Sequence, residues 1–495
     1  MMKKISIDPI TRLEGHGRID IFLNDEGEVE NAYFVIPELR GFEKFAEGRP
    51  VEEMIRITPR ICGVCPEAHH MAATKACDAV YHVDPPPAAK RVREAFYSFF
   101  YCSDHATHFY ALAAPDFVMG PDCPVPQRNI LGIIHKVGLE IGGRVIQHLA
   151  ENHRAVGIIG GKDIHPVGGI PGGWSKPISE EERQELVRIA RNSVEFGQFS
   201  LKLFTDVVLG NQAYVDMILS DAFTVPCYSM GLVDANNKVN FYDGLVRVVD
   251  PDGNEFVKYA PHEYREVVAE KVLPYTYLKY PYLKKVGWKG FVAGKDSGVY
   301  HATPLSRLNA SEGMATPLAQ EEYERFYETL TGDRSGRKPV HQMLATHWAR
   351  LIEMLYAAER ALELVSDPDF TDPNVRTIPT ATPTEGVGIV EAPRGTLTHH
   401  YITDERGIVQ KANLIVGTTN NYAPLTISIQ KAAKAVIRKG VEITEGILNR
   451  IEMAFRSYDP CFGCATHTLP GQMPLEVVVY DANGEIVARG SRGID

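Results

Sequence analysis

The stretch RICGVCPEAH at residues 60–69 places two cysteines three positions apart, with a histidine four residues after the second. A second stretch, DPCFGCATH at residues 459–467, has the same cysteine spacing near the other end of the chain, with a histidine three residues after the second cysteine. Two such pairs can present four sulfur atoms, a donor set that suits zinc, copper(I), iron–sulfur iron or a soft nickel site. The spacing therefore predicts a thiolate metal site at which the two ends of the fold converge.

The cysteine spacing alone leaves the metal open. A structural zinc is one alternative, although the two pairs of a zinc site usually lie close in sequence, and here residues 66–460 separate them. A thiol–disulfide oxidoreductase is another, but it needs one Cys-x-x-Cys motif within a βαβ unit, a context that is missing. Charged residues that could flank the pairs favour a redox metal: Arg12, Glu14, Asp104, Arg394 and Asp459.

Composition excludes several classes of protein. With 44% hydrophobic and 23% charged residues, the 495-residue chain is typical of globular proteins and long enough for two or three subdomains. The net charge of −11 argues against nucleic acid as a partner, because phosphate binding usually needs a clustered basic surface. We find no apolar run of about 18 residues and no signal segment at the start, so we expect a cytoplasmic protein without a direct membrane span.

The hydrophobic pattern predicts an α+β fold that is mainly α-helical. Short alternating stretches around Asn24–Gly27 predict a β-hairpin near the N-terminus, and β patterning returns over 386–416 and again over 474–490. Apolar residues recur at helical spacing in a series of runs, which indicates a central bundle of long helices. The runs are 88–114, 128–153, 180–209, 321–330, 340–364 and 425–455.

Four segments follow from these patterns. Residues 1–84 form an N-terminal α/β segment with the first cysteine pair, and residues 85–375 form the helical bundle. The bundle is interrupted at about 211–307 by an irregular insertion in which turn residues and aromatics predict short strands. Residues 376–467 form a β and helical segment with the second pair, and 468–495 form a C-terminal extension.

Along essentially its whole length, the sequence resembles the large subunit of [NiFe]-hydrogenases. Six motifs in the same order carry the resemblance: DPITRLEGH (8–16), RGFE (40–43), RICGVC (60–65), DHATHFY (104–110), EAPRG (391–395) and DPCFGCATH (459–467). The single departure that we notice is Gly463, where relatives often have Ser or Ala. Gly463 is not a metal ligand in this pattern.

The resemblance implies a nickel–iron centre. In the family, four cysteines hold nickel, and two of them bridge to an iron that carries carbon monoxide and cyanide. Carried over, Cys62 and Cys461 are terminal ligands of nickel, while Cys65 and Cys464 bridge nickel and iron. Soft, polarizable sulfur lets nickel change oxidation state with limited rearrangement. The implied reaction is the reversible heterolytic cleavage of dihydrogen to protons and electrons.

The resemblance also assigns residues that handle the proton and the charge. The Cys461 thiolate is the expected first proton acceptor and Glu14 the next, because a carboxyl group in a dry site tends to have a raised pKa. Arg394 is expected to lie over the metals, fixed by Asp104 and Asp459, and to offer a positive field. Without the resemblance, Glu14 would be interpreted as a strand-surface charge and the other three as a buried ion-pair cluster.

Three further assignments rest on the resemblance. His69 is expected to donate a hydrogen bond to the sulfur of Cys65, although alone it would be interpreted as a core histidine. Glu43 and His467 match a magnesium site of the family. The remaining cysteines lack paired spacing and are expected to be small core residues, not iron–sulfur ligands: Cys77, Cys102, Cys123 and Cys227.

A chain without iron–sulfur ligands needs a partner to carry electrons. The family uses a small subunit with iron–sulfur clusters, and GKDIHP at residues 161–166 resembles the segment that faces the nearest cluster. The chain resembles the soluble multi-subunit branch, whose partners pass electrons to heterodisulfide reductase, the deazaflavin F420 or NAD(P), and we expect the first. The rival is a respiratory-complex scaffold subunit that has lost the cysteines, and four intact cysteines argue against it.

Relatives are commonly made with a C-terminal extension that a maturation protease removes after the last histidine of the second motif. Residues 468–495 match such an extension. A chain that keeps these residues is either an unprocessed precursor or a member of the family that retains its extension, and we expect the first.

Overall fold

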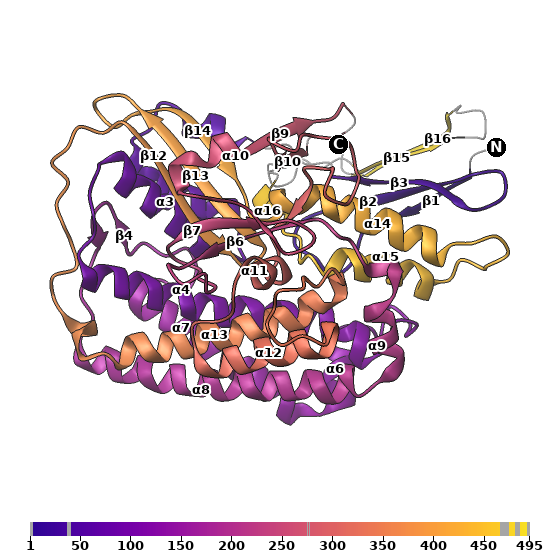
Figure 1. Ribbon diagram of the computed structural model, residues 1–495, viewed down its shortest axis with the longest axis horizontal. Coiled ribbons are helices and arrows are strands. Elements are labelled where there is room, and N and C mark those ends of the chain that lie inside the picture. Colours follow the sequence, from indigo (N-terminus) through magenta and orange to yellow (C-terminus); the bar gives the residue numbers. More distant parts are fainter. Residues whose placement is uncertain are drawn as a thin grey trace.

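Long helices occupy one side of the molecule and small sheets the other (Figure 1). The computed structural model describes residues 3–36, 41–274, 276, 278–465, 475–480 and 486–492, with side chains up to residue 463. The predicted α+β, mainly helical fold is confirmed. None of the described helices is both long and apolar enough to cross a membrane.

Four long helices form the bundle: α4 (Pro87–Thr107), α7 (Leu139–Gly160), α8 (Glu180–Phe204) and α13 (Thr346–Ser366). Helix α13 lies at the centre, because it packs against both α4 and α8 and residues 346–358 are all buried. Helix α8 begins with a capping box in which Ser179 and Glu182 satisfy each other's backbone N–H groups. The bundle thus has one largely buried helix at its centre, with the other long helices packed around it.

Two of the predicted helical runs end in π-helical segments, and two others are each divided into two helices. The run over 128–153 is divided at Gly138 into α6 (Ile130–Val137) and α7. Helices α4 and α8 continue as π-helices over His108–Ala113 and Thr205–Leu209. The expected run over 425–455 is two helices, α14 (Tyr422–Val436) and α15 (Glu445–Arg456). The chain turns between them at Gly440, which has a φ of +79° that favours glycine. A continuous helix over 425–455 was therefore the wrong prediction.

The N-terminal sheet consists of β1 (Lys3–Ile7), β2 (Arg18–Leu23) and β3 (Val29–Val35), antiparallel and in that order. The predicted hairpin around Asn24–Gly27 is confirmed as the β2–β3 connection. The Asn24 side chain accepts the backbone N–H groups of residues 26 and 28, which closes the turn. Helix α14 packs against β3 and ties this sheet to the C-terminal third of the chain.

A second antiparallel sheet lies directly on α3 (Pro66–Val80), the helix that follows the first cysteine pair. Its strands are β12 (Glu385–Ala392), β13 (Gly395–Thr403) and β14 (Val409–Ile415). A Cβ atom at Gly388 would lie 2.3 Å from the Ala72 carbonyl oxygen, so only glycine lets β12 approach the helix this closely. This packing fixes α3, and with it Cys65, against the turn that carries Arg394.

The insertion at 211–307 is more regular than its sequence indicates. It contains a four-stranded sheet in the order β11-β6-β7-β8 and a separate antiparallel pair, β9 and β10. Strand β11 runs parallel to β6, whereas the other pairs are antiparallel. The strands are β6 (Tyr228–Val233), β7 (Leu245–Val249), β8 (Glu255–Tyr259), β9 (Val268–Val272), β10 (Lys279–Leu283) and β11 (Tyr300–His301).

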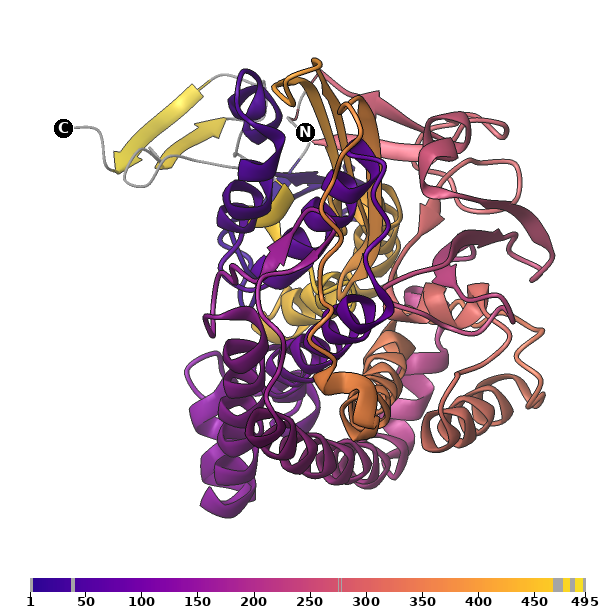
Figure 2. The ribbon, with the colours of Figure 1, turned by 90° about the vertical axis from the view of Figure 1, so that its left-hand side faces the viewer.

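The remaining elements are mostly short. The helices are α1 (Phe42–Ala46), α2 (Met54–Ile57), α5 (Ala114–Val118), α6 (Ile130–Val137), α9 (Gln212–Leu219), α10 (Tyr264–Val267), α11 (Pro304–Ala310), α12 (Pro317–Thr331) and α16 (Phe462–Ala465). The strands are β4 (Gly169–Ile170), β5 (Gly173–Trp174), β15 (Leu475–Tyr480) and β16 (Ile486–Arg492). Strands β15 and β16 pair as the predicted C-terminal hairpin, which projects from the body in Figure 2.

The two ends of the chain meet beside the second cysteine pair. Glu14 and Cys461 form an isolated parallel β-bridge, in which the Phe462 N–H donates to the Glu14 carbonyl at 3.0 Å. The Phe462 ring packs against Phe34 of β3 and Phe455 of α15. The N-terminal sheet and the C-terminal helices therefore share one apolar cluster, as the convergence of the two motifs requires.

Candidate metal centre

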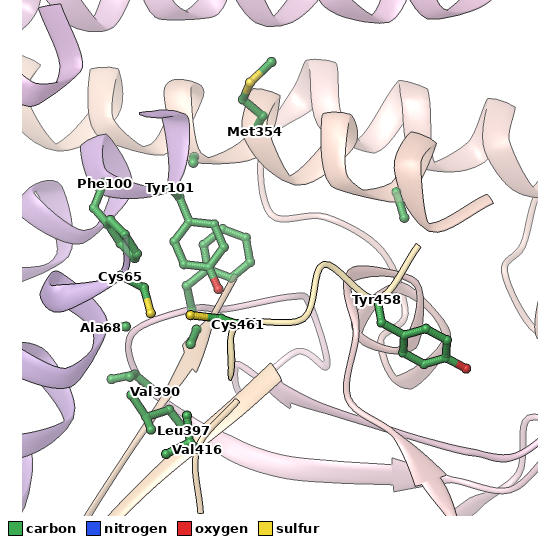
Figure 3. Close-up of a cluster of buried hydrophobic side chains, with 14 of the residues drawn as sticks. Cys65, Ala68, Phe100, Tyr101, Met354, Val390, Leu397, Val416, Tyr458 and Cys461 are labelled. Atoms are coloured by element: carbon green, nitrogen blue, oxygen red, sulfur yellow. The ribbon is translucent and has the colours of Figure 1, made fainter. Parts of the chain in front are cut away.

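Three cysteine sulfurs from opposite ends of the chain lie together in the interior. Cys62 follows the 3₁₀-helical turn Thr58–Ile61, Cys65 precedes the first turn of α3, and Cys461 precedes α16. Their Sγ atoms all lie within 4.8 Å of one another, and those of Cys62 and Cys461 are 3.3 Å apart. All three side chains are buried. Figure 3 shows the Cys65 and Cys461 sulfurs turned toward each other.

The backbone around the first pair is shaped to carry negative charge on sulfur. The N–H groups of Val64 and Cys65 both donate to Cys62 Sγ, at 3.2 and 3.3 Å. Successive backbone N–H groups that converge on one atom stabilise an anion there. This local fold therefore suits a thiolate ligand.

The second pair is presented by a strained turn. Asp459 has a φ of +51°, a left-handed conformation that costs a non-glycine residue about 1–3 kcal/mol. The Cys461 N–H then donates to Thr418 Oγ1 at 3.1 Å, which holds the cysteine in place. The side chain of Cys464 and the whole of His467 lie outside the described residues.

Glu14 touches the second pair directly. The Cys461 thiol donates to Glu14 Oε2 at 3.0 Å, and the Gly463 N–H donates to the same oxygen at 2.8 Å. Burial and the nearby Cys62 raise the pKa of Glu14, although these hydrogen bonds and Arg394 oppose the shift. A Cβ atom at position 463 would lie 2.2 Å from Glu14 Oε1, so Gly463 gives this carboxylate its room.

Arg394 is held between two buried carboxylates. Its Nη1 lies 2.9 Å from Asp104 Oδ2 and its Nη2 lies 3.0 Å from Asp459 Oδ2. Burial opposes the charge on Arg394, yet the two carboxylates raise its pKa well above the usual value, so it stays cationic. Burial also raises the pKa of both acids, because it disfavours their charged forms, and brings that of Asp459 to about 7, with a smaller contribution from the charge of Asp104. The Arg394 side chain lines the small cavity between Cys65 and Cys461.

His69 lies in the same cavity and begins a row of hydrogen bonds. Its Nδ1 lies 3.1 Å from His399 Nε2, and His399 Nδ1 lies 2.8 Å from the Tyr401 hydroxyl. If the tyrosine donates, His399 must donate from Nε2, and His69 then carries its own proton on Nε2. The hydrogen bonds from Tyr401 through His399 to His69 thus leave the Nε2 of His69 as the nitrogen that can donate.

The remaining predicted residues lie farther out. Glu43 sits on α1, where its Oε1 accepts the Leu414 N–H at 3.1 Å. His165 is half-buried beside Pro59 and Arg60, close to the first cysteine pair. Cys77, Cys102 and Cys227 are buried as expected, whereas Cys123 is only half-buried, because the loop after α5 leaves it near the surface. Within the described part of the chain, the three site cysteines form the one group of metal-ligand side chains.

The sequence matches the nickel-dependent hydrogenase family over residues 40–121 and 144–467. The chain belongs to that family. A HoxL-like match covers residues 4–39. This hydrogenase chain is thus the large, catalytic subunit of a [NiFe]-hydrogenase, an oxidoreductase, as its motifs predict.

Relatives of this hydrogenase chain align over nearly its full length. It is 47% identical to an iron-sulfur subunit of the F420-non-reducing hydrogenase of Archaeoglobus profundus, over 98% of this chain and 99% of the relative. It is 41% identical to its counterpart in the F420-non-reducing hydrogenase of Methanothermobacter marburgensis, with 99% and 100% covered. It is 37% identical to the beta subunit of the NAD-reducing hydrogenase HoxS of Cupriavidus necator, again with 99% and 100% covered.

Solved structures agree with the fold. A chain of an NAD+-reducing [NiFe]-hydrogenase in the H2-reduced state superposes with a TM-score of 0.86 and 35% identity, over 94% of this chain and 99% of that one. A Ni-Fe-Se hydrogenase from D. vulgaris Hildenborough, at 22% identity and a TM-score of 0.73, supports the fold alone. A nickel–iron centre at the three cysteines is consistent with this membership.

Several residues around the site escaped sequence reasoning. Arg350 and Glu353 are both fully buried on α13, and His105 follows Asp104 on α4. A signal was available, because an arginine and a glutamate three positions apart interrupt the apolar run of 346–358. His399, five residues after Arg394, carried no comparable signal.

Proposed function

We propose that this chain catalyses the reversible heterolytic cleavage of dihydrogen at a nickel–iron centre held by Cys62, Cys65, Cys461 and Cys464. The observation that carries the proposal is the convergence of three buried sulfurs, within 4.8 Å of one another, beside the carboxylate of Glu14. When bound, the centre, whose iron we propose carries carbon monoxide and cyanide, polarises dihydrogen and takes up its electrons.

The residues present fit such a centre better than a structural zinc. Zinc in a closed four-cysteine site needs no acid–base group beside it. Here Glu14 accepts a hydrogen bond from a ligand thiol, and Arg394 lines the adjoining cavity. Among the described residues, Arg394 Nε, Asp104 Oδ1 and, apart from its ion pairs, Asp459 Oδ2 are buried without a hydrogen-bond partner, which leaves polar atoms available around the cavity.

The proton leaves through Cys461 and Glu14. The Cys461 sulfur takes the proton first and passes it to Glu14 Oε2, 3.0 Å away, a distance suited to direct transfer. The raised pKa of Glu14 favours its uptake of the proton. Glu14 is half-buried, so water can receive the proton from it.

Arg394, Asp104 and Asp459 set the electric field of the cavity. The guanidinium is a fixed positive charge in a place that excludes water, where such a charge acts strongly on developing negative charge. Asp104 and Asp459 hold it by separate Nη atoms, so it cannot turn away. With its proton on Nε2, His69 would donate toward the sulfur of Cys65 and lower the electron density on it.

Two electrons leave with each dihydrogen, and we propose that a small subunit with iron–sulfur clusters receives them. Val64 lies between the two cysteines of the first pair, and Ile164 lies within the 161–166 segment. Both are apolar yet 37% and 52% exposed. An exposed apolar surface of this kind suits a protein partner. Because the F420-non-reducing relatives are the more similar ones, we assign heterodisulfide reductase as the acceptor rather than F420 or NAD(P).

We also assign a magnesium ion to Glu43 and His467, and a maturation protease to the C-terminal extension. The Leu414 N–H orients the Glu43 carboxylate, whose oxygens are hard donors of the kind that magnesium prefers. The family match ends at residue 467, immediately before the extension. Intact-mass analysis of active enzyme tests the extension, because a retained 468–495 segment contradicts its removal.

Isotope exchange tests the proposed site. Purified holoenzyme should form HD from dihydrogen in deuterated water, since this exchange needs only the heterolytic step. Cys461→Ser should lose both nickel and exchange, because serine oxygen is a poor ligand for this soft centre. Cys227→Ser, at a buried cysteine outside the group, should retain both. Exchange that survives in Cys461→Ser would overturn the proposal.

A further inference from the structure

We propose that Arg350, His105, Glu353 and Arg307 form a buried support that fixes the position of Arg394 and Asp459, and that Arg350 is a positioning residue for hydrogen turnover. The inference rests on the proposed function of Arg394. None of the four residues belongs to the cysteine group, and each is fully buried.

Arg350 links the site to this support. Its Nη1 lies 3.1 Å from Asp459 Oδ2, the same oxygen that faces Arg394 Nη2. Nη1 also donates to His105 Nδ1 at 3.2 Å and, more weakly, to the Pro393 carbonyl at 3.4 Å. Arg350 therefore touches both the carboxylate that holds Arg394 and the backbone residue that precedes it.

The polarity of the next contacts is fixed by chemistry. A guanidinium can only donate, so His105 must accept at Nδ1 and carry its proton on Nε2. His105 Nε2 then donates to Glu353 Oε2 at 3.0 Å. Burial lowers the pKa of His105 to about 3, which keeps the ring neutral and preserves this tautomer. Glu353 thus orients the His105 ring, and His105 in turn fixes the direction of the Arg350 guanidinium.

Arg307 completes the support from α11. It binds Glu353 with two parallel contacts of 2.6 Å, from Nε to Oε1 and from Nη2 to Oε2. It also donates to the carbonyls of Ala392 and Pro393, at 3.0 and 3.2 Å. Arg307 and Arg350 therefore both donate hydrogen bonds to backbone carbonyls of the turn between β12 and β13, which carries Arg394.

The hydrogen bonds to the Arg394 turn are more specific than the stability of a buried core requires. Asn421 donates to the Arg394 carbonyl at 2.7 Å, so three consecutive carbonyls, those of residues 392, 393 and 394, each accept a side-chain donor. Apolar residues of similar volume usually stabilise a core at least as well as buried ion pairs. A donor set aimed at one turn and one carboxylate instead determines where the Arg394 guanidinium lies.

Arg350→Lys tests the inference in the complete hydrogenase. Lysine keeps the charge but is a compact point donor that cannot match the planar guanidinium. We expect unchanged nickel and iron content, unchanged KM for dihydrogen, and a kcat about 10–100-fold lower, the scale of loss that a small misplacement produces. The infrared cyanide bands should shift, because the Arg394 donors move. Arg360→Lys is the matched control. Arg360 lies on the same helix, but its Nε is 2.7 Å from Glu94 Oε1 and it takes no part in the contacts to Asp459.

A pair of His105 variants keeps the test decisive if Arg350→Lys fails to load metal. His105→Asn keeps an acceptor near Nδ1 for Arg350, whereas His105→Gln keeps only a donor near Nε2 for Glu353. We expect His105→Gln to have the lower kcat of the two variants, because it lacks the acceptor for Arg350. Equal kcat in the two variants, or wild-type kcat and bands in Arg350→Lys, would overturn the inference. Failure of the proposed function is distinguishable, because wild-type enzyme would then lack nickel, the bands and isotope exchange.

Discussion

Glu14→Gln separates the proton function of Glu14 from its structural contacts. Both described donors, the Cys461 thiol and the Gly463 N–H, reach the same oxygen, Oε2. A glutamine whose oxygen takes that place keeps both hydrogen bonds, while its amide nitrogen takes the place of Oε1. The amide cannot accept a proton at ordinary pH, so we expect metal binding to survive and proton transfer to fail.

The size of the loss follows from the position of Glu14. Removal of a positioned acid–base group typically costs 10²–10⁴-fold in rate. Glu14 is half-buried, so water can partly take its place, and we expect the lower end of this range. A loss of about 100-fold corresponds to about 2.7 kcal/mol in the activation free energy.

The assay is hydrogen-dependent reduction of an artificial electron acceptor, with nickel and iron measured on the same samples. Glu30→Gln, at an exposed position of β3, is the control and should keep wild-type turnover. Full turnover in Glu14→Gln with full nickel content would refute the assignment of Glu14 to the proton path. Loss of nickel would instead show that its role is structural.

Four further substitutions test packing and hydrogen bonding, in the site and in the rest of the fold. Gly463→Ala should displace the Glu14 carboxylate and lower turnover at constant nickel content, since a Cβ would lie 2.2 Å from Oε1; unchanged turnover would contradict this. Tyr401→Phe should shift the infrared bands of the metal ligands without loss of metal, because His399 loses the donor that sets its tautomer; identical bands would argue against the row. Gly388→Ala should lower the free energy of unfolding by about 1–3 kcal/mol through overpacking against α3. Gly143→Ala, with open space around it, should raise that energy by about 0.5–1 kcal/mol in denaturant titrations.

The cysteine motifs and their flanking residues predicted the site because each motif places its chemistry within a few residues. The structure brings Glu14, Arg394, Asp104 and Asp459 around the cysteine group, as the motifs indicate. Their roles remain predictions. The hairpin at Asn24–Gly27 was equally local, because an Asn side chain and a glycine close the turn without help from the rest of the chain.

The features that escaped prediction depend on contacts between distant segments. Arg350 donates to His105, 245 positions away in sequence, and no spacing rule links them. The parallel pairing of β11 with β6 is likewise set by tertiary packing rather than by the two residues of β11. The break at Gly440 was a local signal that helical periodicity on either side concealed.

Metal analysis combined with infrared spectroscopy of the purified enzyme tests the central claim most directly. We predict about one nickel per chain, the stoichiometry that a single four-thiolate site implies, with iron and with bands from carbon monoxide and cyanide. Zinc alone at the four cysteines, without those bands, would contradict the account.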